Sequence, residues 1–122
     1  MAYGIKRVPS KAFNAEEVIN FIHEQGGIAV CAHPYSNRHN AFGDKVYNYK
    51  FDAIELNGAI GKKSNKLGEK AAIIMDLPTI GGSDAHSKSQ LNTKVTKLNS
   101  NITSIAAIIK AVKNKECKAI NL

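Results

Sequence analysis

The spacing of apolar residues alternates between a helical period and short continuous apolar runs, as in α/β proteins. The first helical stretch follows Asn14, which can cap a helix with Glu17 as its reciprocal partner, and its apolar stripe stops at Gly26–Gly27. A second helix is expected over Ser64–Leu77, where Pro78 ends it. Both helices carry an apolar face, so we expect them to cover a sheet.

A third helix is expected near the end of the chain. Ser100 or Asn101 can cap it. Its apolar positions keep a helical spacing: Ile102, Ile105, Ile108, Ile109 and Val112. After this helix, Ala119–Ile120 is expected to form a short terminal strand.

Three short apolar runs predict the strands of a sheet: Ile28–Ala32, Asp52–Asn57 and Thr79–Gly82. The first run is almost wholly apolar, as expected of a parallel strand that is covered on both faces. Between the first two strands, Tyr35–Lys50 has no firm period, and we expect a long loop with a short helix, a kind of segment that often carries function. Repeated strand–helix units predict an α/β fold with a mainly parallel sheet, flanking helices and right-handed crossovers.

The composition is that of a folded chain, and we expect one domain over residues 1–122. Hydrophobic residues make up 43% and charged residues 22% of the chain, values that argue against disorder. No apolar run is long enough to span a bilayer, and the first residues have no hydrophobic stretch of the signal-peptide type, so a cytoplasmic location is expected. Cys31 and Cys117 form no CxxC pair, which argues against a disulfide framework or a thiolate zinc site.

The net charge of +7 is spread along the chain, mostly on lysines, which is typical of a solvated surface. There is no basic block and no aromatic stacking pattern of the kind that marks a nucleic-acid interface. Lys62–Lys63 and Lys66 form the densest local group, close to a predicted helix start. This group either steers a phosphate or is a solvated helix end.

Candidate metal ligands follow two of the predicted strands. His33 comes directly after the first strand, and Asp84 and His86 follow the third. Side chains two residues apart point to the same side of an extended segment, so Asp84 and His86 are expected to act together. Three protein ligands are the usual set of a catalytic site with an open position, whereas a structural zinc site has four. The carboxyl ends of parallel strands are also where such sheets bind ligands.

The strand Asp52–Asn57 has a useful alternation. Ile54 and Leu56 are expected to face the covering helices, which leaves Glu55 and Asn57 on the opposite face. A buried Glu needs a cation, a metal or backbone donors as its partner. We therefore expect these two polar residues to point toward either the interior or the mouth of the sheet.

Three runs together resemble the C-terminal half of the PHP (polymerase and histidinol phosphatase) superfamily: Gly27–Pro34, Asp52–Asn57 and Leu77–His86. Members of that superfamily are distorted seven-stranded β/α barrels that hold two or three divalent metals at the strand ends and hydrolyse phosphoesters. By this resemblance, His33 matches the late histidine ligand, and Asp84 and His86 match the final Asp-x-His ligand pair.

The chain departs from the family pattern before His33. The family begins with a His-x-His motif followed by further His and Glu ligands, whereas here His23 alone precedes His33, within a predicted amphipathic helix. Three or four strands cannot close such a barrel. We therefore expect a partial PHP-type domain without the N-terminal half: a fragment of a longer protein, a shortened homologue, or one half that pairs with another chain.

The resemblance implies a metal-dependent phosphoesterase, in which a metal-activated water hydrolyses a phosphoester. The expected cofactor is Zn, Mn or Fe, which this chain alone need not bind. The expected partners are a phosphorylated small molecule or a nucleotide, together with the N-terminal half of the same protein or a second copy of the chain. The residue pattern assigns no catalytic acid or base.

Further residues are candidates for contact with the substrate or for support of the metal ligands: Glu55, Asn57, Ser83, Ser87 and His39. The first two are placed by the alternation of their strand. The backbone amides around the two serines can receive a phosphate, and the glycines before them allow close approach or simply a tight turn. His39 lies in the long loop, where it is either a phosphate contact or a solvent-exposed residue.

Two other functions remain open from the residues alone. One is a noncatalytic binding or scaffold module that takes a protein partner or nucleic acid, with binding that weakens in salt because of the positive charge. The other is a structural zinc site in which Glu55 completes the tetrahedron with His33, Asp84 and His86.

Overall fold

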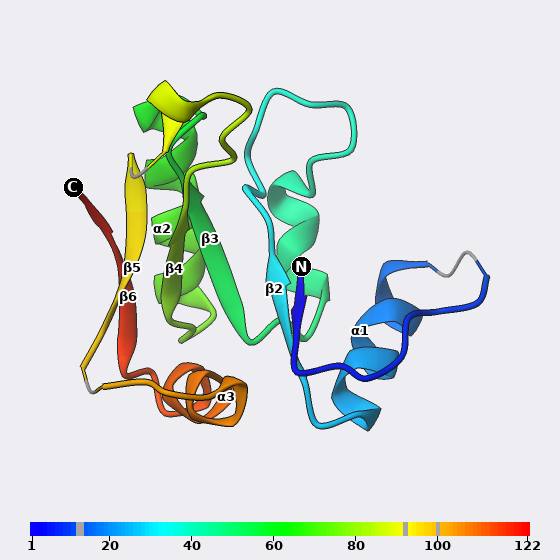
Figure 1. Cartoon of the computed structure of the whole chain (residues 1–122). Helices are drawn as coiled ribbons and strands as arrows, with labels where there is room; N and C mark the ends of the chain where they lie inside the picture. Colours follow the sequence, from blue (N-terminus) through cyan, green and yellow to red (C-terminus); the bar gives the residue numbers. More distant parts are fainter. Residues whose placement is uncertain (12–13, 92, 100) are drawn as a thin grey trace.

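The computed structural model describes residues 1–11, 14–91, 93–99 and 101–122. In chain order its elements are β1 (Ala2–Tyr3), α1 (Ala15–Glu24), β2 (Ile28–Cys31), the 3-10 helix η1 (Gly43–Asn48), β3 (Ala53–Asn57), α2 (Lys62–Ile74), β4 (Thr79–Gly82), the 3-10 helix η2 (Lys88–Gln90), β5 (Lys94–Leu98), α3 (Ile105–Lys113) and β6 (Cys117–Asn121) (Figure 1). The long loop between β2 and β3 contains its expected short helix, η1.

The strands form one four-stranded sheet in the order β1-β2-β3-β4 and a separate antiparallel pair, β5-β6. β2, β3 and β4 are parallel, with Cys31 opposite Ile54 and Asn57 opposite Gly82, while β1 runs antiparallel to β2. The α/β class with a mainly parallel sheet is therefore confirmed. The four described strands leave this sheet open, and closure into a barrel stays a prediction.

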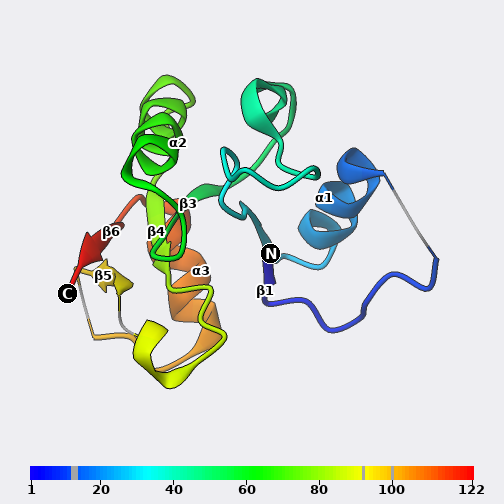
Figure 2. The same cartoon turned by 90° about the horizontal axis from the view of Figure 1, so that it is seen from above.

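Helices cover both faces of the parallel strands, which explains why these strands are so apolar. On one face, Ile54 of β3 packs with Ala71 and Ala72 of α2, and on the other, Val30 of β2 packs with Val112 of α3. Figure 2 shows α2 and α3 on opposite sides of β3 and β4. α1 lies beside β1 and β2 instead, where its own apolar residues contact β2. The sheet is thus held from three sides, and its carboxyl edge carries the loops that form the candidate site.

The start of α1 agrees with its predicted cap. The Asn14 side chain accepts a hydrogen bond from the Glu17 N–H at 3.0 Å, and the Glu17 carboxylate accepts one from the Asn14 N–H at 2.9 Å. A helix start leaves four N–H groups without an acceptor inside the helix, and these two hydrogen bonds satisfy two of them.

The prediction for α2 was wrong at both ends, because this helix begins at Lys62 and ends at Ile74. Asp76 adopts a left-handed φ of 53°, and the Leu77 N–H donates to the Ala72 carbonyl oxygen at 2.9 Å. This is a Schellman closure, which ends the helix before Pro78 is reached. Like the other helices in the described ranges, α2 is not long and apolar enough to cross a membrane.

The predicted start of the last helix was also wrong. Ser100 lies outside the described residues, and Asn101 does not cap the helix. The cap is Ser104, whose hydroxyl oxygen accepts the Ala107 N–H at 3.1 Å, so that Ile102 precedes the helix. The terminal strand is longer than expected and pairs with β5 along its whole length.

Both cysteines, Cys31 and Cys117, are buried and unpaired in disulfides. Burial raises the pKa of the Cys31 thiol to about 12. Desolvation also raises the pKa of Cys117. Neutral thiols of this kind pack as small apolar groups, and both cysteines belong to the buried core clusters.

Gly81 sets the close approach of β4 to β5. Its N–H donates to the Thr96 hydroxyl at 2.9 Å, and a Cβ at this position would collide with the backbone of Val95. We expect Gly81→Ala to lower the free energy of unfolding by about 1–3 kcal/mol, the usual cost of overpacking. Denaturant unfolding measures this loss.

A matched control is Gly61→Ala, because no heavy atom lies within 4 Å of a Cβ built there. Alanine is only a poorer N-cap than glycine, so the control should cost less than about 1 kcal/mol. Equal losses in the two variants would contradict the packing of β4 against β5.

Candidate active site at the carboxyl edge of the sheet

His33 follows β2 and is held by a buried carboxylate from the neighbouring strand. Its backbone adopts a φ of 27°, and its N–H donates to Glu55 Oε2 at 2.9 Å. The Glu55 residue is 6% exposed. Within the described part of the chain, the buried Nδ1 atom of His33 has no hydrogen-bond partner. The backbone of His33 is therefore fixed, while its ring is left free to bind a ligand.

Asp84 lies across the sheet edge from His33. It follows β4, and its Oδ2 atom is 4.0 Å from His33 Nε2 and 2.9 Å from the Arg38 guanidinium. His33 and Asp84 are both mostly buried, whereas the Arg38 side chain is 58% exposed. Arg38 thus neutralises a carboxylate that would otherwise carry an uncompensated charge in a partly desolvated site.

His86 is exposed, and its ring is fixed by the backbone of Asp84. The ring Nδ1 lies 2.8 Å from the Asp84 carbonyl oxygen, which can only accept, so Nδ1 carries the proton. The lone pair of a neutral His86 ring is then on Nε2. Donation of the other ring nitrogen to a backbone carbonyl is the usual arrangement of a histidine that binds a metal.

The structure brings two of the three predicted ligands together. His33 and Asp84 converge, but His86 does not join them: the described residues contain no group of three His, Cys, Asp or Glu side chains that could hold a metal ion. The donors themselves fit a divalent cation, because an unpartnered imidazole beside a carboxylate suits zinc, manganese or iron.

The alternation predicted for β3 is confirmed. Ile54 packs in the core cluster that includes α2, and Leu56 lies against Gly68 of the same helix. On the opposite face, Glu55 reaches His33 and closely approaches Gly82, where a Cβ would collide with its carboxylate. Gly82 is therefore needed to give Glu55 its room beside the site.

Asn57 also lies on that opposite face, but it acts in the loop after β3. It is 1% exposed, its side-chain oxygen accepts the Ala59 N–H at 2.8 Å, and its Nδ2 atom is buried without a partner among the described residues. Asn65 of α2 binds the Asn57 backbone through both its side-chain oxygen and its side-chain nitrogen. Asn57 thus fixes the loop that leads into α2.

The remaining candidates are not gathered in one place. The Ser83 hydroxyl lies 3.5 Å from the Lys94 carbonyl oxygen, and the Ser87 N–H donates to Gln90 Oε1 at 3.0 Å, so this amide is not free for a phosphate. His39 is exposed and lines a cavity next to His33. Arg38 was not predicted as a site residue, although it lies beside His39 in the long loop and is one of only two arginines in the sequence.

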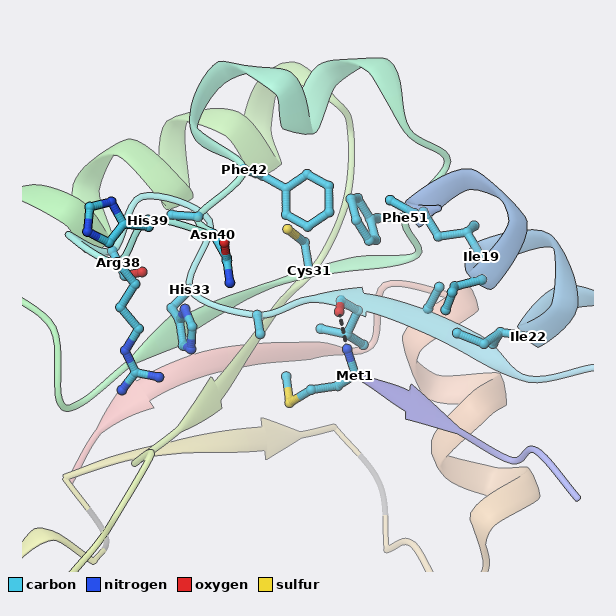
Figure 3. A pocket seen from close by; sticks show the side chains of 17 residues that line it. Met1, Ile19, Ile22, Cys31, His33, Arg38, His39, Asn40, Phe42 and Phe51 are labelled. Carbon is cyan, nitrogen blue, oxygen red and sulfur yellow. Dashed lines mark hydrogen bonds between the residues drawn. The ribbon is translucent and has the colours of Figure 1, made fainter. Parts of the chain in front are cut away.

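An apolar cavity of about 580 Å³ opens beside His33 (Figure 3). Ile19 and Ile22 of α1 lie at one end, and Phe42 packs edge-on against Phe51 with ring centroids 5.3 Å apart. The other end is polar and carries the site residues His33, Arg38, His39 and Asn40. An apolar body with a polar mouth is the usual form of a small-molecule site.

Part of this chain matches a known protein family. Residues 62–117 match the model of a family described as PHP-associated. The matched segment runs from α2 to the start of β6 and includes Asp84 and His86 but not His33. The match supports an association of this segment with PHP proteins and is consistent with a resemblance to the C-terminal half of that superfamily.

One relative is the uncharacterized protein MJ1587 of Methanocaldococcus jannaschii. It is 35% identical over an alignment of 75 residues. The match covers 52% of this chain and 44% of the relative. The match thus spans less than half of the length of that protein.

The hydrogen bond from His33 to Glu55 gives a stability test. Glu55→Ala removes the acceptor of a buried N–H group, which should lower the free energy of unfolding by about 1–3 kcal/mol. Glu55→Gln keeps an oxygen that can accept this bond and should lose less. Denaturant unfolding and amide exchange at His33 measure both effects, and an equal loss in the two variants would contradict the assigned role of Glu55.

Proposed function

We propose that this chain is part of a metal-dependent phosphoesterase, whose divalent cation is held by His33, Asp84 and His86. The observation that carries the proposal is the 4.0 Å approach of His33 Nε2 to Asp84 Oδ2, from two different strands of a parallel sheet. Ligands of open α/β sheets bind at this edge. The association of residues 62–117 with the PHP superfamily gives additional support.

Each residue of the site has a distinct task. Glu55 holds the backbone of His33 in place, and Arg38 balances the charge of Asp84. When bound, a divalent cation supplies Lewis-acid chemistry, namely activation of water and neutralisation of phosphoryl charge. His86 would present its Nε2 lone pair to the cation, with Nδ1 held by the Asp84 carbonyl oxygen.

The cavity beside His33 supports a substrate with an apolar or aromatic organic part. Its inner walls are isoleucines and phenylalanines, while its polar mouth adjoins the proposed metal ligands. A phosphorylated small molecule or a nucleotide could therefore place its organic part against Phe42 and its phosphate near His33. Aromatic rings pack well against such walls.

The rest of the ligand set is expected to come from elsewhere. A PHP-type site has more ligands than this chain offers in its described residues, so the N-terminal half of a longer protein or a second copy would complete it. The alternative function is a noncatalytic binding module derived from the same fold. The lack of a three-ligand group in the described residues favours it, and metal binding decides between the two.

A metal and activity assay tests the proposal. Chain dialysed against Mn²⁺ or Zn²⁺ should retain metal and should hydrolyse an aryl phosphate monoester only when metal is present. His33→Asn and Asp84→Asn tolerate the positive φ of these positions and should each lower both metal affinity and activity by ~100-fold. Metal content by mass spectrometry and initial rates measure the two losses.

The matched controls are His39→Asn and Asp44→Asn, which change exposed residues of the same types. Both should leave the metal content unchanged. Retention of metal by His33→Asn and Asp84→Asn would contradict the proposed ligands. A parent chain that binds no metal would mean either that the missing half is needed or that the chain is a noncatalytic module.

A further inference from the structure

The N-terminus of α2 presents unusual positive charge at the edge of the candidate site. Its cap residue is Gly61, which makes no side-chain hydrogen bond to the helix, and the first turn contains no acidic residue. The first backbone hydrogen bond of the helix runs from the Asn65 N–H to the Gly61 carbonyl oxygen. The N–H groups of residues 62–64 therefore have no acceptor within the helix. Lys62 and Lys63 add cations where the helix dipole is already positive.

A second observation points to a ligand at the same place. Ser36, in the turn after His33, is 9% exposed, and its hydroxyl oxygen is buried without a partner within the described ranges. Ser36 lines a cavity of about 230 Å³ together with Gly61 and Ser64 at the start of α2. A buried hydroxyl without a partner is destabilising, and a ligand that accepts a hydrogen bond from it would remove this cost.

The chemistry of this cavity fits an anion. Arg38 lines it too, and the guanidinium uses one nitrogen for Asp84 while its other N–H groups remain able to donate. No carboxylate lines the cavity, whose other residues are Asn37, Ala59 and Ile60. The space is several times the ~30 Å³ share of one water molecule in the liquid. A compact group with several acceptor oxygens would match donors on two chain segments, the loop after β2 and the start of α2.

We propose that this cavity is a phosphate-binding subsite, in which the start of α2 at Gly61 and Ser64, the Ser36 hydroxyl and the Arg38 guanidinium bind a phosphate group of the substrate. The helix start supplies backbone donors and a favourable dipole for the anion. Arg38 connects the subsite to Asp84, so the bound phosphate lies next to the proposed metal ligands. The substrate assignment rests on the proposed function, but phosphate binding itself needs no metal.

Titration of the metal-free, ¹⁵N-labelled chain with inorganic phosphate at constant ionic strength tests the subsite. We expect saturable shifts of the amide signals of residues 36–38 and 62–64. Ser36→Ala and Arg38→Gln should each weaken phosphate binding by about tenfold, equivalent to ~1.4 kcal/mol. The amide spectra of both variants show whether they are folded, and Arg38 is exposed enough for its replacement to leave the fold intact.

Matched controls are Ser10→Ala and Arg7→Gln, which change an exposed serine and the other arginine of the chain. Both should bind phosphate as the parent does. The subsite is refuted if the parent shows no saturable shift at residues 36–38 and 62–64, or if Ser36→Ala and Arg38→Gln bind as tightly as the controls.

The outcomes also separate this proposal from the phosphoesterase proposal. Phosphate binding at the helix start without metal-dependent hydrolysis supports the subsite and contradicts the enzyme. Metal-dependent hydrolysis without saturable phosphate shifts supports the enzyme and overturns the subsite.

Discussion

The parallel pairing of β2, β3 and β4 is the constraint on which the candidate site depends. Parallel strands end at the same edge of a sheet, so residues far apart in the sequence meet there. The register places Cys31 opposite Ile54 and Asn57 opposite Gly82, and the segments after β2 and β4 then carry His33 and Asp84 to the same edge. A one-residue shift of register would exchange the two faces of β3, which would place Glu55 against α2 in place of Ile54 and Leu56.

Glu55 links the arrangement of the strands to the position of His33. It is a buried carboxylate in the middle strand, and it reaches His33 on one side and Gly82 on the other. A buried carboxylate without hydrogen bonds is costly. The bond to the His33 N–H therefore serves the stability of the sheet and the position of the proposed ligand at once, which joins folding and function in a single contact.

Several elements of the fold could be predicted from the sequence, because the types and spacing of neighbouring residues determine them. The Asn14 cap, the strand Thr79–Gly82 and the alternation in β3 depend on residues within a few positions of each other. Helix ends were less predictable: a Schellman closure stopped α2 before Pro78, and Ser104 capped the last helix.

The site could be predicted only in part. His33 and Asp84 were identifiable from their places after strands, since that topology follows from the strand–helix alternation. The pairing of Arg38 with Asp84 and the burial of Ser36 depend on how a long loop folds over the sheet edge, and no periodic pattern encodes that path. The contact of the His86 ring with the Asp84 carbonyl oxygen is likewise a local backbone interaction that spacing does not reveal.

The central claim is that the carboxyl edge of the parallel strands binds a divalent cation. Paramagnetic broadening by substoichiometric Mn²⁺ in the amide spectrum of the chain locates such a cation directly. We expect broadening centred on residues 32–34 and 84–87. Broadening centred on another carboxylate and histidine would contradict the claim, for example on His23 and Asp52, which are 2.8 Å apart beside Ala29 near the start of β2. The absence of localised broadening would contradict it as well.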